Sequence, residues 1–267
     1  MKLNNEYIEI EINDNAEIIS VKFEDKELLY QANETWKKQF PIIFPSLGIS
    51  KGFSHNGKTF EMPKHGFWKN LAWESFFENG EILSVATLMD KEKFPFFLDI
   101  TQRIGVDQDT FYINYEIANL EDKESFFHFG IHPAFKIDDS TFISNLPETK
   151  IIDLEGKLTN RELSIRGLLI DSLGFGEDYD TLIAQNIEDK SIILNTENHQ
   201  LHMKFDSPHL QIWKPKNDNF ICIEPWYGKN DAWYKAPSEV SKKEEIISLS
   251  PGSIWSATFE VKVKNNK

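Results

Sequence analysis

Hydrophobic and polar positions alternate along much of the chain. Residues 7–13 place three isoleucines on one face and two glutamates on the other, and residues 111–117 alternate in the same way. Residues 259–263 repeat the pattern near the end of the chain. A period of two is typical of strands with one buried face. Further strand-like runs lie at 81–88, 96–104, 201–205 and 209–213.

Short turn sequences separate these runs. Asn-Gly pairs at 56–57 and 79–80 and a Pro-Gly pair at 251–252 are typical of tight turns. Only residues 160–173 have a weak helical pattern. Many short strands at close spacing predict an all-β antiparallel sandwich. No shift in composition marks a linker and no internal repeat is visible, so we predict one domain over residues 1–267.

The composition is that of a folded protein with a large core. The chain has 267 residues, 40% of them hydrophobic, with 21 Phe and 7 Trp. A net charge of −14 repels phosphate backbones and anionic lipid, so nucleic acid and membrane surfaces are poor partners. The single cysteine, Cys222, excludes an internal disulfide. Neither a signal peptide nor an apolar run of ~20 residues is present, so we expect a cytoplasmic protein.

The stretch FFHFGIHPAFKI at 126–137 ends an alternating run at a histidine followed by a proline. As a strand, it places His128, Gly130 and His132 on one face. Pro133 holds His132 in an extended conformation and interrupts the ladder, so the imidazole has a fixed direction at a strand end. In the alternative interpretation, both histidines face solvent on an exposed sheet.

In FICIEPWYG at 220–228, a glutamate stands directly before a proline, as His132 does in the previous stretch. Both faces of this run are apolar until Glu224, which predicts a strand that is buried on both sides and ends there. Such a carboxylate is costly to bury unless it is paired or reaches a cleft. Trp226 and Tyr227 follow, and aromatic rings beside a carboxylate are typical of sugar sites. In the alternative interpretation, Glu224 faces solvent in a loop and Trp226 fills the core.

Other chemistry is weakly indicated or missing. His65 lies beside Trp68 in MPKHGFW at 62–68, and a lone histidine near aromatic residues is usually structural. The sequence has no convincing metal-ligand spacing, no nucleotide-binding glycine motif and no serine-hydrolase motif. We therefore expect no metal site.

Five stretches, taken together and in order, resemble the aldose 1-epimerase (galactose mutarotase-like) superfamily, and within it the LacX-like branch. They are PIIFPSLG (41–48), NGKTFEMPKHGF (56–67), FGIHPAF (129–135), ICIEPWYG (221–228) and KKEEIISLSPG (242–252). The resemblance covers nearly the whole chain. It implies a single-domain antiparallel β-supersandwich with a concave sugar cleft.

The resemblance also implies roles for individual residues. His132 resembles the general acid of the family, and Glu224 resembles its general base. His65 resembles a substrate-binding histidine, and Asp180 in EDYDTLI is the best match for a cleft aspartate. The functional atoms of the acid and the base should lie on the order of 5–8 Å apart. His65 and at least one of Trp68, Trp226 and Tyr227 should line the same pocket.

The implied activity is that of an isomerase of carbohydrate metabolism that interconverts the α and β anomers of a free aldohexose. A base takes the proton of the anomeric hydroxyl and an acid protonates the ring oxygen, so the ring opens and closes on the other face. Nearby carboxylates would keep the imidazole of the acid protonated. This chemistry requires no cofactor. A small-molecule sugar is the expected partner, and we expect a monomer or weak homodimer.

Two alternatives stay open, a non-catalytic carbohydrate-binding or regulatory protein on the same fold and a hexose-6-phosphate 1-epimerase. The branch leads us to expect an arginine after FP..G and another in HGFAR. This chain has Ile49 and Ser50 at the first place and Trp68-Lys69 at the second. Arginine suits bidentate recognition of phosphate, so its absence favours a free sugar.

Overall fold

The structure is a computed structural model that describes residues 1–31, 36–153, 155–233 and 238–266. In these ranges the chain consists of strands, turns and three 3-10 turns, at Trp68–Asn70, Asp231–Trp233 and Val240–Lys242. The ladders between strands are antiparallel, so the predicted all-β antiparallel fold is confirmed. None of the helices in the described ranges is long and apolar enough to cross a membrane.

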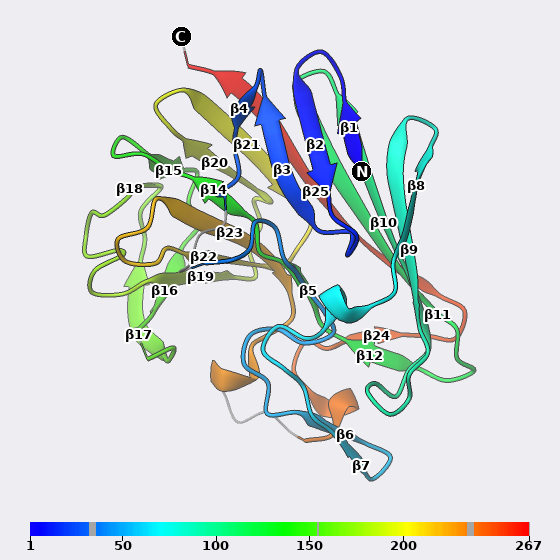
Figure 1. The fold of residues 1–267 in the computed structure, drawn as a ribbon. Helices are drawn as coiled ribbons and strands as arrows, with labels where there is room; N and C mark the ends of the chain where they lie inside the picture. Colours follow the sequence, from blue (N-terminus) through cyan, green and yellow to red (C-terminus); the bar gives the residue numbers. More distant parts are fainter. Residues whose placement is uncertain (32–35, 154, 234–237, 267) are drawn as a thin grey trace.

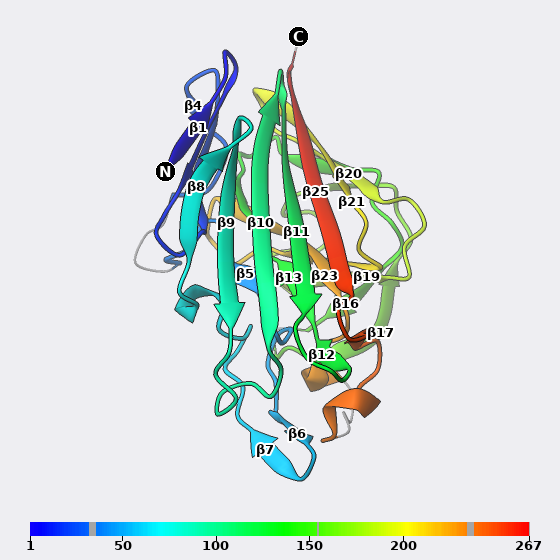
Figure 2. The ribbon, with the colours of Figure 1, turned by 90° about the vertical axis from the view of Figure 1, so that its right-hand side faces the viewer.

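The larger of the two main sheets has nine strands, and its long central strands lie side by side in Figure 2. In spatial order the strands are β18 (Gly167–Leu169), β15 (Phe142–Ser144), β20 (Ser191–Asn195), β21 (His199–Phe205), β25 (Ile254–Asn265), β11 (Thr110–Asn119), β10 (Leu98–Asp107), β9 (Glu81–Leu88) and β8 (Glu74–Glu78). The weak helical pattern at 160–173 is therefore misleading, because this segment contains β18 and the end of a strand of the other sheet.

The second main sheet has eight strands. In spatial order they are β17 (Leu158–Leu163), β16 (Thr149–Ile152), β19 (Thr181–Gln185), β22 (His209–Trp213), β23 (Phe220–Tyr227), β13 (Phe129–Ile131) and β5 (Ile42–Ile43), with β14 (Ala134–Lys136) also paired to β23. All eight residues of β23 are buried, as the two apolar faces of its sequence predicted. The strand does not end at Glu224, because Pro225 lies within it and is paired with Leu210 of β22.

Smaller sheets complete the fold, as Figure 1 shows. They comprise a four-stranded sheet of β1 (Lys2–Asn4), β2 (Ile8–Ile12), β3 (Ile18–Phe23) and β4 (Lys26–Glu27), a hairpin of β6 (Phe53–His55) and β7 (Lys58–Phe60), and a pair of β12 (Ser125–Phe127) and β24 (Ile247–Leu249). The hairpin turns at Asn56-Gly57, where both residues have positive φ, as an Asn-Gly turn requires.

Aromatic side chains pack the two main sheets together. Tyr115 of β11 contacts Phe129 of β13 with ring centroids 4.9 Å apart, and Trp255 of β25 contacts the same ring at 5.1 Å. Each buried aromatic ring contributes about 1.5–3 kcal/mol of transfer free energy, so this layer fixes β13 and β23 firmly. The opposite face of β13 and β23 is thereby free to form a site.

The single-domain organisation stays a prediction.

Candidate active site

The pairing of β13 and β14 with β23 brings His132 and Glu224 together. Gly130 lies opposite Trp226 in the ladder, and Ala134 lies opposite Cys222. The register is the same on both sides of Pro133, so His132 stands opposite Glu224. The amide of Ile223 donates a hydrogen bond of 3.2 Å to the carbonyl of Pro133 and keeps the strands in line across the proline.

His132 and Glu224 are in direct contact. The Nε2 atom of His132 lies 3.3 Å from the Oε1 atom of Glu224, and the side chains are 6% and 0% exposed. This distance is shorter than the predicted 5–8 Å. The backbone amide of His132 also donates to the carbonyl of Pro41, which fixes the histidine on the side of β5. An acid and a base in contact can exchange a proton with each other as well as with a bound molecule.

Two donors hold the other oxygen of the Glu224 carboxyl. Its Oε2 atom accepts hydrogen bonds of 3.1 Å from Nε2 of Gln211 and from Nε1 of Trp226. Burial raises the pKa of Glu224 to about 8, although both hydrogen bonds and the positive charge of Lys64 act in the opposite direction. Burial therefore outweighs these interactions, and the carboxyl keeps a proton at neutral pH unless His132 takes it.

The imidazole of His132 is held in an apolar, aromatic setting. Burial lowers the pKa of His132 well below its usual range, and neighbouring His65 lowers it further. The structure thus contradicts the prediction that nearby carboxylates keep this imidazole protonated, because desolvation outweighs the attraction. Trp36 stacks on the imidazole with ring centroids 5.3 Å apart, and Trp213 meets it edge-on at 5.9 Å.

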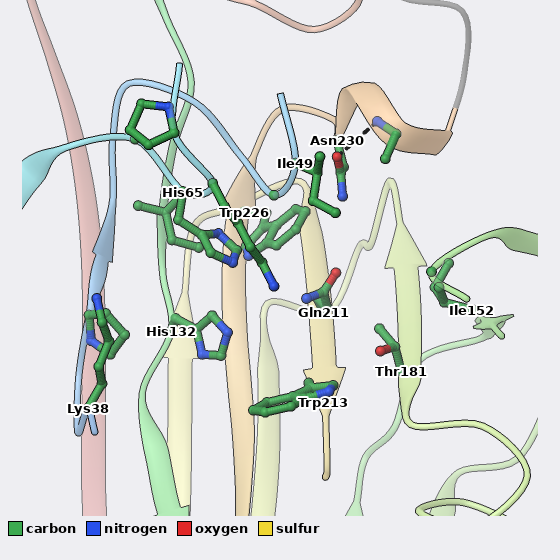
Figure 3. Close-up of a pocket in the computed structure, with 18 of the residues that line it drawn as sticks. Lys38, Ile49, His65, His132, Ile152, Thr181, Gln211, Trp213, Trp226 and Asn230 are labelled. Carbon is green, nitrogen blue, oxygen red and sulfur yellow. Dashed lines mark hydrogen bonds between the residues drawn. The ribbon is translucent and has the colours of Figure 1, made fainter. Parts of the chain in front are cut away.

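A cavity of about 810 Å³ opens in front of His132. Figure 3 shows His65 and Trp226 above His132, Gln211 and Trp213 beside it, and Thr181 across the cavity. This volume falls in the range of small-molecule sites. Glu224 does not line the cavity itself and contacts two residues that do, His132 and Gln211.

His65 is positioned by an unusual backbone. It has a φ of 63°, and the following Gly66 has a φ of 71°. A Cβ atom at residue 66 would lie 2.0 Å from the carbonyl oxygen of Phe44, so only glycine fits here. The imidazole of His65 meets that of His132 edge-on with centroids 5.5 Å apart. Burial lowers the pKa of His65 to about 3, and Lys64 and Lys38 add to the effect, so His65 is neutral.

Asp180 also lines the cavity and is half-buried. Its Oδ2 atom accepts a hydrogen bond of 3.1 Å from Nε1 of Trp213, and its Oδ1 atom accepts one of 2.7 Å from the hydroxyl of Thr181. The aspartate suggested by the resemblance therefore reaches the same cavity as both histidines. Its oxygens are held by neutral donors, which leaves the carboxylate free to accept from sugar hydroxyls.

The predicted aromatic residues do not all reach the cavity. Trp226 and Trp68 line it, although Trp68 is mainly packed against core rings. The structure corrects the prediction for Tyr227, whose side chain projects from the other face of β23. Its hydroxyl donates to Asp206 and its ring packs edge-on against Trp255. Neighbouring residues of a strand point to opposite faces, so Trp226 and Tyr227 could not both line one pocket.

His128 also lies away from the cavity. It is buried, and a Cβ atom at Gly228 would come within 2.3 Å of its Cδ2 atom. Burial lowers the pKa of His128 to about 4. His128 and His132 are both buried, so the alternative in which they face solvent is wrong. Of the two, only His132 lines the cavity.

Sequence reasoning missed several side chains that shape the site, namely Gln211, Trp213, Trp36 and Lys64. Gln211 and Trp213 share one face of β22, so a polar residue between His209 and a tryptophan in HLQIW could have indicated them. Trp36 and Lys64 lie in irregular segments whose sequences carry no such pattern.

Within the described residues, one group could hold a metal ion. Ligand atoms of His132, Cys222 and Glu224 all lie within 4.8 Å of one another. Burial raises the pKa of the Cys222 thiol well above its usual range, which disfavours the thiolate that a metal would need. Proton transfer between the histidine and the glutamate needs no such ion. The expectation of no metal site stays a prediction.

The comparison with protein families decides the assignment. The aldose 1-epimerase family model matches residues 2–262. The chain belongs to the aldose 1-epimerase family. Membership supports a sugar epimerase or mutarotase activity in general terms. No curated protein gives a match.

Solved structures share the fold of this aldose 1-epimerase family member. A galactose mutarotase related enzyme from Lactobacillus acidophilus is 25% identical with a TM-score of 0.88, over 100% of this chain and 97% of that chain. A galactose mutarotase-like protein from Lactobacillus casei is 22% identical with a TM-score of 0.86, over 99% of both chains. A galactose 1-epimerase from Lactobacillus acidophilus is 14% identical with a TM-score of 0.73, over 100% of this chain and 94% of that chain. The LacX-like branch stays a prediction.

Proposed function

We propose that the protein is an isomerase that interconverts the α and β anomers of an aldohexose without a cofactor. The observation that carries this proposal is the contact between His132, which lines a cavity large enough for a small molecule, and the buried Glu224 behind it. An acid and a base in contact are what ring opening requires, because one proton must leave the anomeric hydroxyl while another reaches the ring oxygen.

The reaction is balanced by these two residues. The anomeric hydroxyl must pass between His132 and Gln211 to reach the carboxyl behind them. Glu224 then accepts the proton of that hydroxyl, the bond between C1 and the ring oxygen breaks, and His132 donates a proton to that oxygen. An open-chain aldehyde results. Rotation about the C1–C2 bond presents the other face of the carbonyl, and the reverse proton transfers close the ring. The net change is inversion at C1, with both residues restored.

The charge state of the pair fits this cycle. The two residues share one proton, which can lie on Glu224 or on His132, and proton transfer between them links these two forms. The form with an imidazolium and a carboxylate is the reactive one. The positive charge of Lys64 and the donors Gln211 and Trp226 favour the carboxylate and so favour this form.

Substrate binding is assigned to the other residues of the cavity. His65 is neutral and can donate to or accept from a sugar hydroxyl, and Asp180 can accept from one. Trp213 and Trp226 offer rings that can pack against the C–H faces of the sugar. We propose no binding role for Tyr227.

The main alternative is a carbohydrate-binding protein without catalysis. The contact between His132 and Glu224 argues against it, because a binding protein gains nothing from a buried carboxyl whose desolvation is costly. The test is to follow anomer exchange by NMR, or the approach to equilibrium rotation by polarimetry, with fresh pure anomers of several aldohexoses. We expect acceleration over the uncatalysed rate. Sugar binding without acceleration would establish the alternative instead.

A further inference from the structure

Two amide side chains face each other in the cavity. Gln211 of β22 and Asn230, which precedes the 3-10 turn at Asp231–Trp233, both line it, and each is only 8% exposed. Figure 3 shows the carboxamide nitrogen of Asn230 turned toward Gln211 and the carboxamide oxygen of Gln211 turned toward Asn230. Buried polar groups normally have hydrogen-bond partners, so a donor and an acceptor that face a cavity indicate a bound polar group.

The orientation of each amide is fixed by a hydrogen-bond partner with a defined role. The backbone N–H of Ala232 can only donate, and it lies 3.0 Å from Oδ1 of Asn230, so Nδ2 is the end that is left for the cavity. The Oε2 atom of Glu224 accepts from Nε2 of Gln211, so Oε1 of Gln211 is the end that is left. Within the described residues, no hydrogen bond occupies Nδ2 of Asn230 or Oε1 of Gln211.

A buried ion pair holds Asn230 in place. The next residue, Asp231, pairs with Lys243, and the two side chains are 3% and 4% exposed. The hydroxyl of Ser50 donates to the same carboxylate at 3.1 Å, which ties this turn to the segment that contains Gly48. A Cβ atom at residue 48 would lie 2.2 Å from Nδ2 of Asn230, so only glycine lets this segment lie against the amide. Asn230 is therefore presented to the cavity in one fixed arrangement.

The proposed reaction indicates which sugar hydroxyl lies between the two amides. C1 of an aldohexose is bonded to the anomeric oxygen, to the ring oxygen and to C2. The anomeric hydroxyl passes between His132 and Gln211 toward Glu224, and His132 protonates the ring oxygen. C2 therefore lies on the Gln211 side, which is also the side of Asn230 in Figure 3. A hydroxyl on C2 can donate to Oε1 of Gln211 and accept from Nδ2 of Asn230 at the same time.

We propose that Asn230 is a specificity-determining residue that, together with Gln211, selects sugars with a hydroxyl group at C2. This inference rests on the epimerase function proposed above and narrows its substrate class. A sugar without a polar group at C2 would leave a donor and an acceptor unpaired at a buried site, which is costly. A protonated amine at C2 would direct its own donors at Nδ2 of Asn230, so 2-amino sugars are selected against.

The test compares glucose, 2-deoxyglucose and glucosamine, and the same three forms of galactose, at a pH where the amine is protonated. Anomer exchange is measured by NMR for each sugar and corrected for its uncatalysed rate. In the series that the protein turns over faster, we expect kcat/KM to be at least about tenfold higher for the 2-hydroxy sugar than for the other two. Equal or faster turnover of the 2-deoxy sugar would overturn this inference and leave the epimerase function standing. No turnover of any sugar would overturn both.

Asn230→Asp separates recognition of the sugar from support of the turn. Aspartate keeps an oxygen that accepts from the amide of Ala232 but has no donor for the C2 hydroxyl. The readout is the ratio of kcat/KM for the 2-hydroxy sugar to that for the 2-deoxy sugar, because a general loss of structure cancels in it. We expect this ratio to fall by at least about fivefold. We also expect glucosamine to improve relative to 2-deoxyglucose, because the carboxylate attracts its ammonium group. An unchanged ratio would give Asn230 a purely structural role and overturn the inference.

Asn70→Ala is the matched control, because Asn70 also lines the cavity but is exposed. Its ratio should stay within about twofold of that of the parent protein. A fall like that of Asn230→Asp would mean that discrimination at C2 does not depend on Asn230. Asn230→Ala, which removes the donor without adding charge beside the pair of Asp231 and Lys243, should lower the ratio by a similar factor and keeps the test valid should Asn230→Asp fail to fold.

Discussion

The Nε2 atom of His132 lies 3.3 Å from the Oε1 atom of Glu224, and the two side chains are almost completely buried. Each residue alone would be costly to charge in this position. Together they form a pair that carries no net charge when it holds one proton, wherever that proton lies. The titration of the site therefore belongs to the pair rather than to either residue.

The first prediction concerns the pH dependence of catalysis. The pair loses its only proton when Glu224 titrates, at about pH 8, and it gains a second proton only well below the usual pKa of histidine. We expect kcat/KM to be level between these limits and to fall about tenfold per pH unit above the upper one. Initial rates of anomer exchange, corrected for the uncatalysed reaction, give the profile. A rate that keeps rising above pH 9 would show that the pair does not need its proton.

Glu224→Gln should abolish most of the activity. The amide can still accept from Gln211 and Trp226 but cannot take the anomeric proton, so we expect a loss of about 10²–10⁴-fold in kcat. The circular dichroism spectrum should match that of the parent protein. Full activity in a folded variant would remove Glu224 from the mechanism.

His132→Asn should have the complementary effect, because asparagine keeps a hydrogen-bond donor but cannot deliver a proton. We expect kcat to fall by about 10²–10⁴-fold. His65→Ala should instead raise KM more than His132→Asn does, since His65 is assigned to binding. Steady-state kinetics of the two variants separate the roles. The reverse pattern would mean that the two histidines have exchanged functions.

The sequence predicted the strands and the two principal site residues because both depend on local pattern. Period-two alternation marks the buried faces of β2, β11 and β25 directly. The same rule, applied strictly, would have separated Tyr227 from Trp226. That error came from treating neighbours in the chain as neighbours in space, which a strand does not allow.

Other properties of the site depend on the tertiary structure. The protonation state of His132 depends on desolvation by Trp36 and Trp213, which come from segments far apart in the sequence. The lining of the cavity likewise combines Lys38 with Lys64 and Lys69. Neither the depth of burial nor the distance between such groups can be obtained from spacing along the chain.

The buried Glu224 carboxyl should also make stability depend on pH. Its pKa is about 8 in the folded protein against 4.5 when exposed. Between these values the folded protein holds a proton that the unfolded chain has lost, so the free energy of unfolding falls as the pH rises. Urea unfolding of the parent protein and of Glu224→Gln at several pH values isolates this contribution as a difference. Relative to the parent protein, the free energy of unfolding of Glu224→Gln should rise by a few kcal/mol between about pH 5 and pH 9. A constant difference would mean that the carboxyl is not buried in this way.

Gln211 offers the sharpest test of how the surroundings tune this pair. Its Nε2 atom donates to the Glu224 carboxyl, which favours the charged form and lowers the pKa of Glu224. Gln211→Leu removes this donor and should therefore move the alkaline limb of the kcat/KM profile to higher pH. We also expect kcat to fall about tenfold or more, because a hydrogen bond to a charged group contributes about 1.5–3 kcal/mol. Thr181→Val is the matched control, since Thr181 lines the same cavity without bonding to Glu224, and its alkaline limb should stay in place. If Gln211→Leu lowers kcat but leaves the limb where it was, Gln211 contacts the sugar and does not position or tune the base.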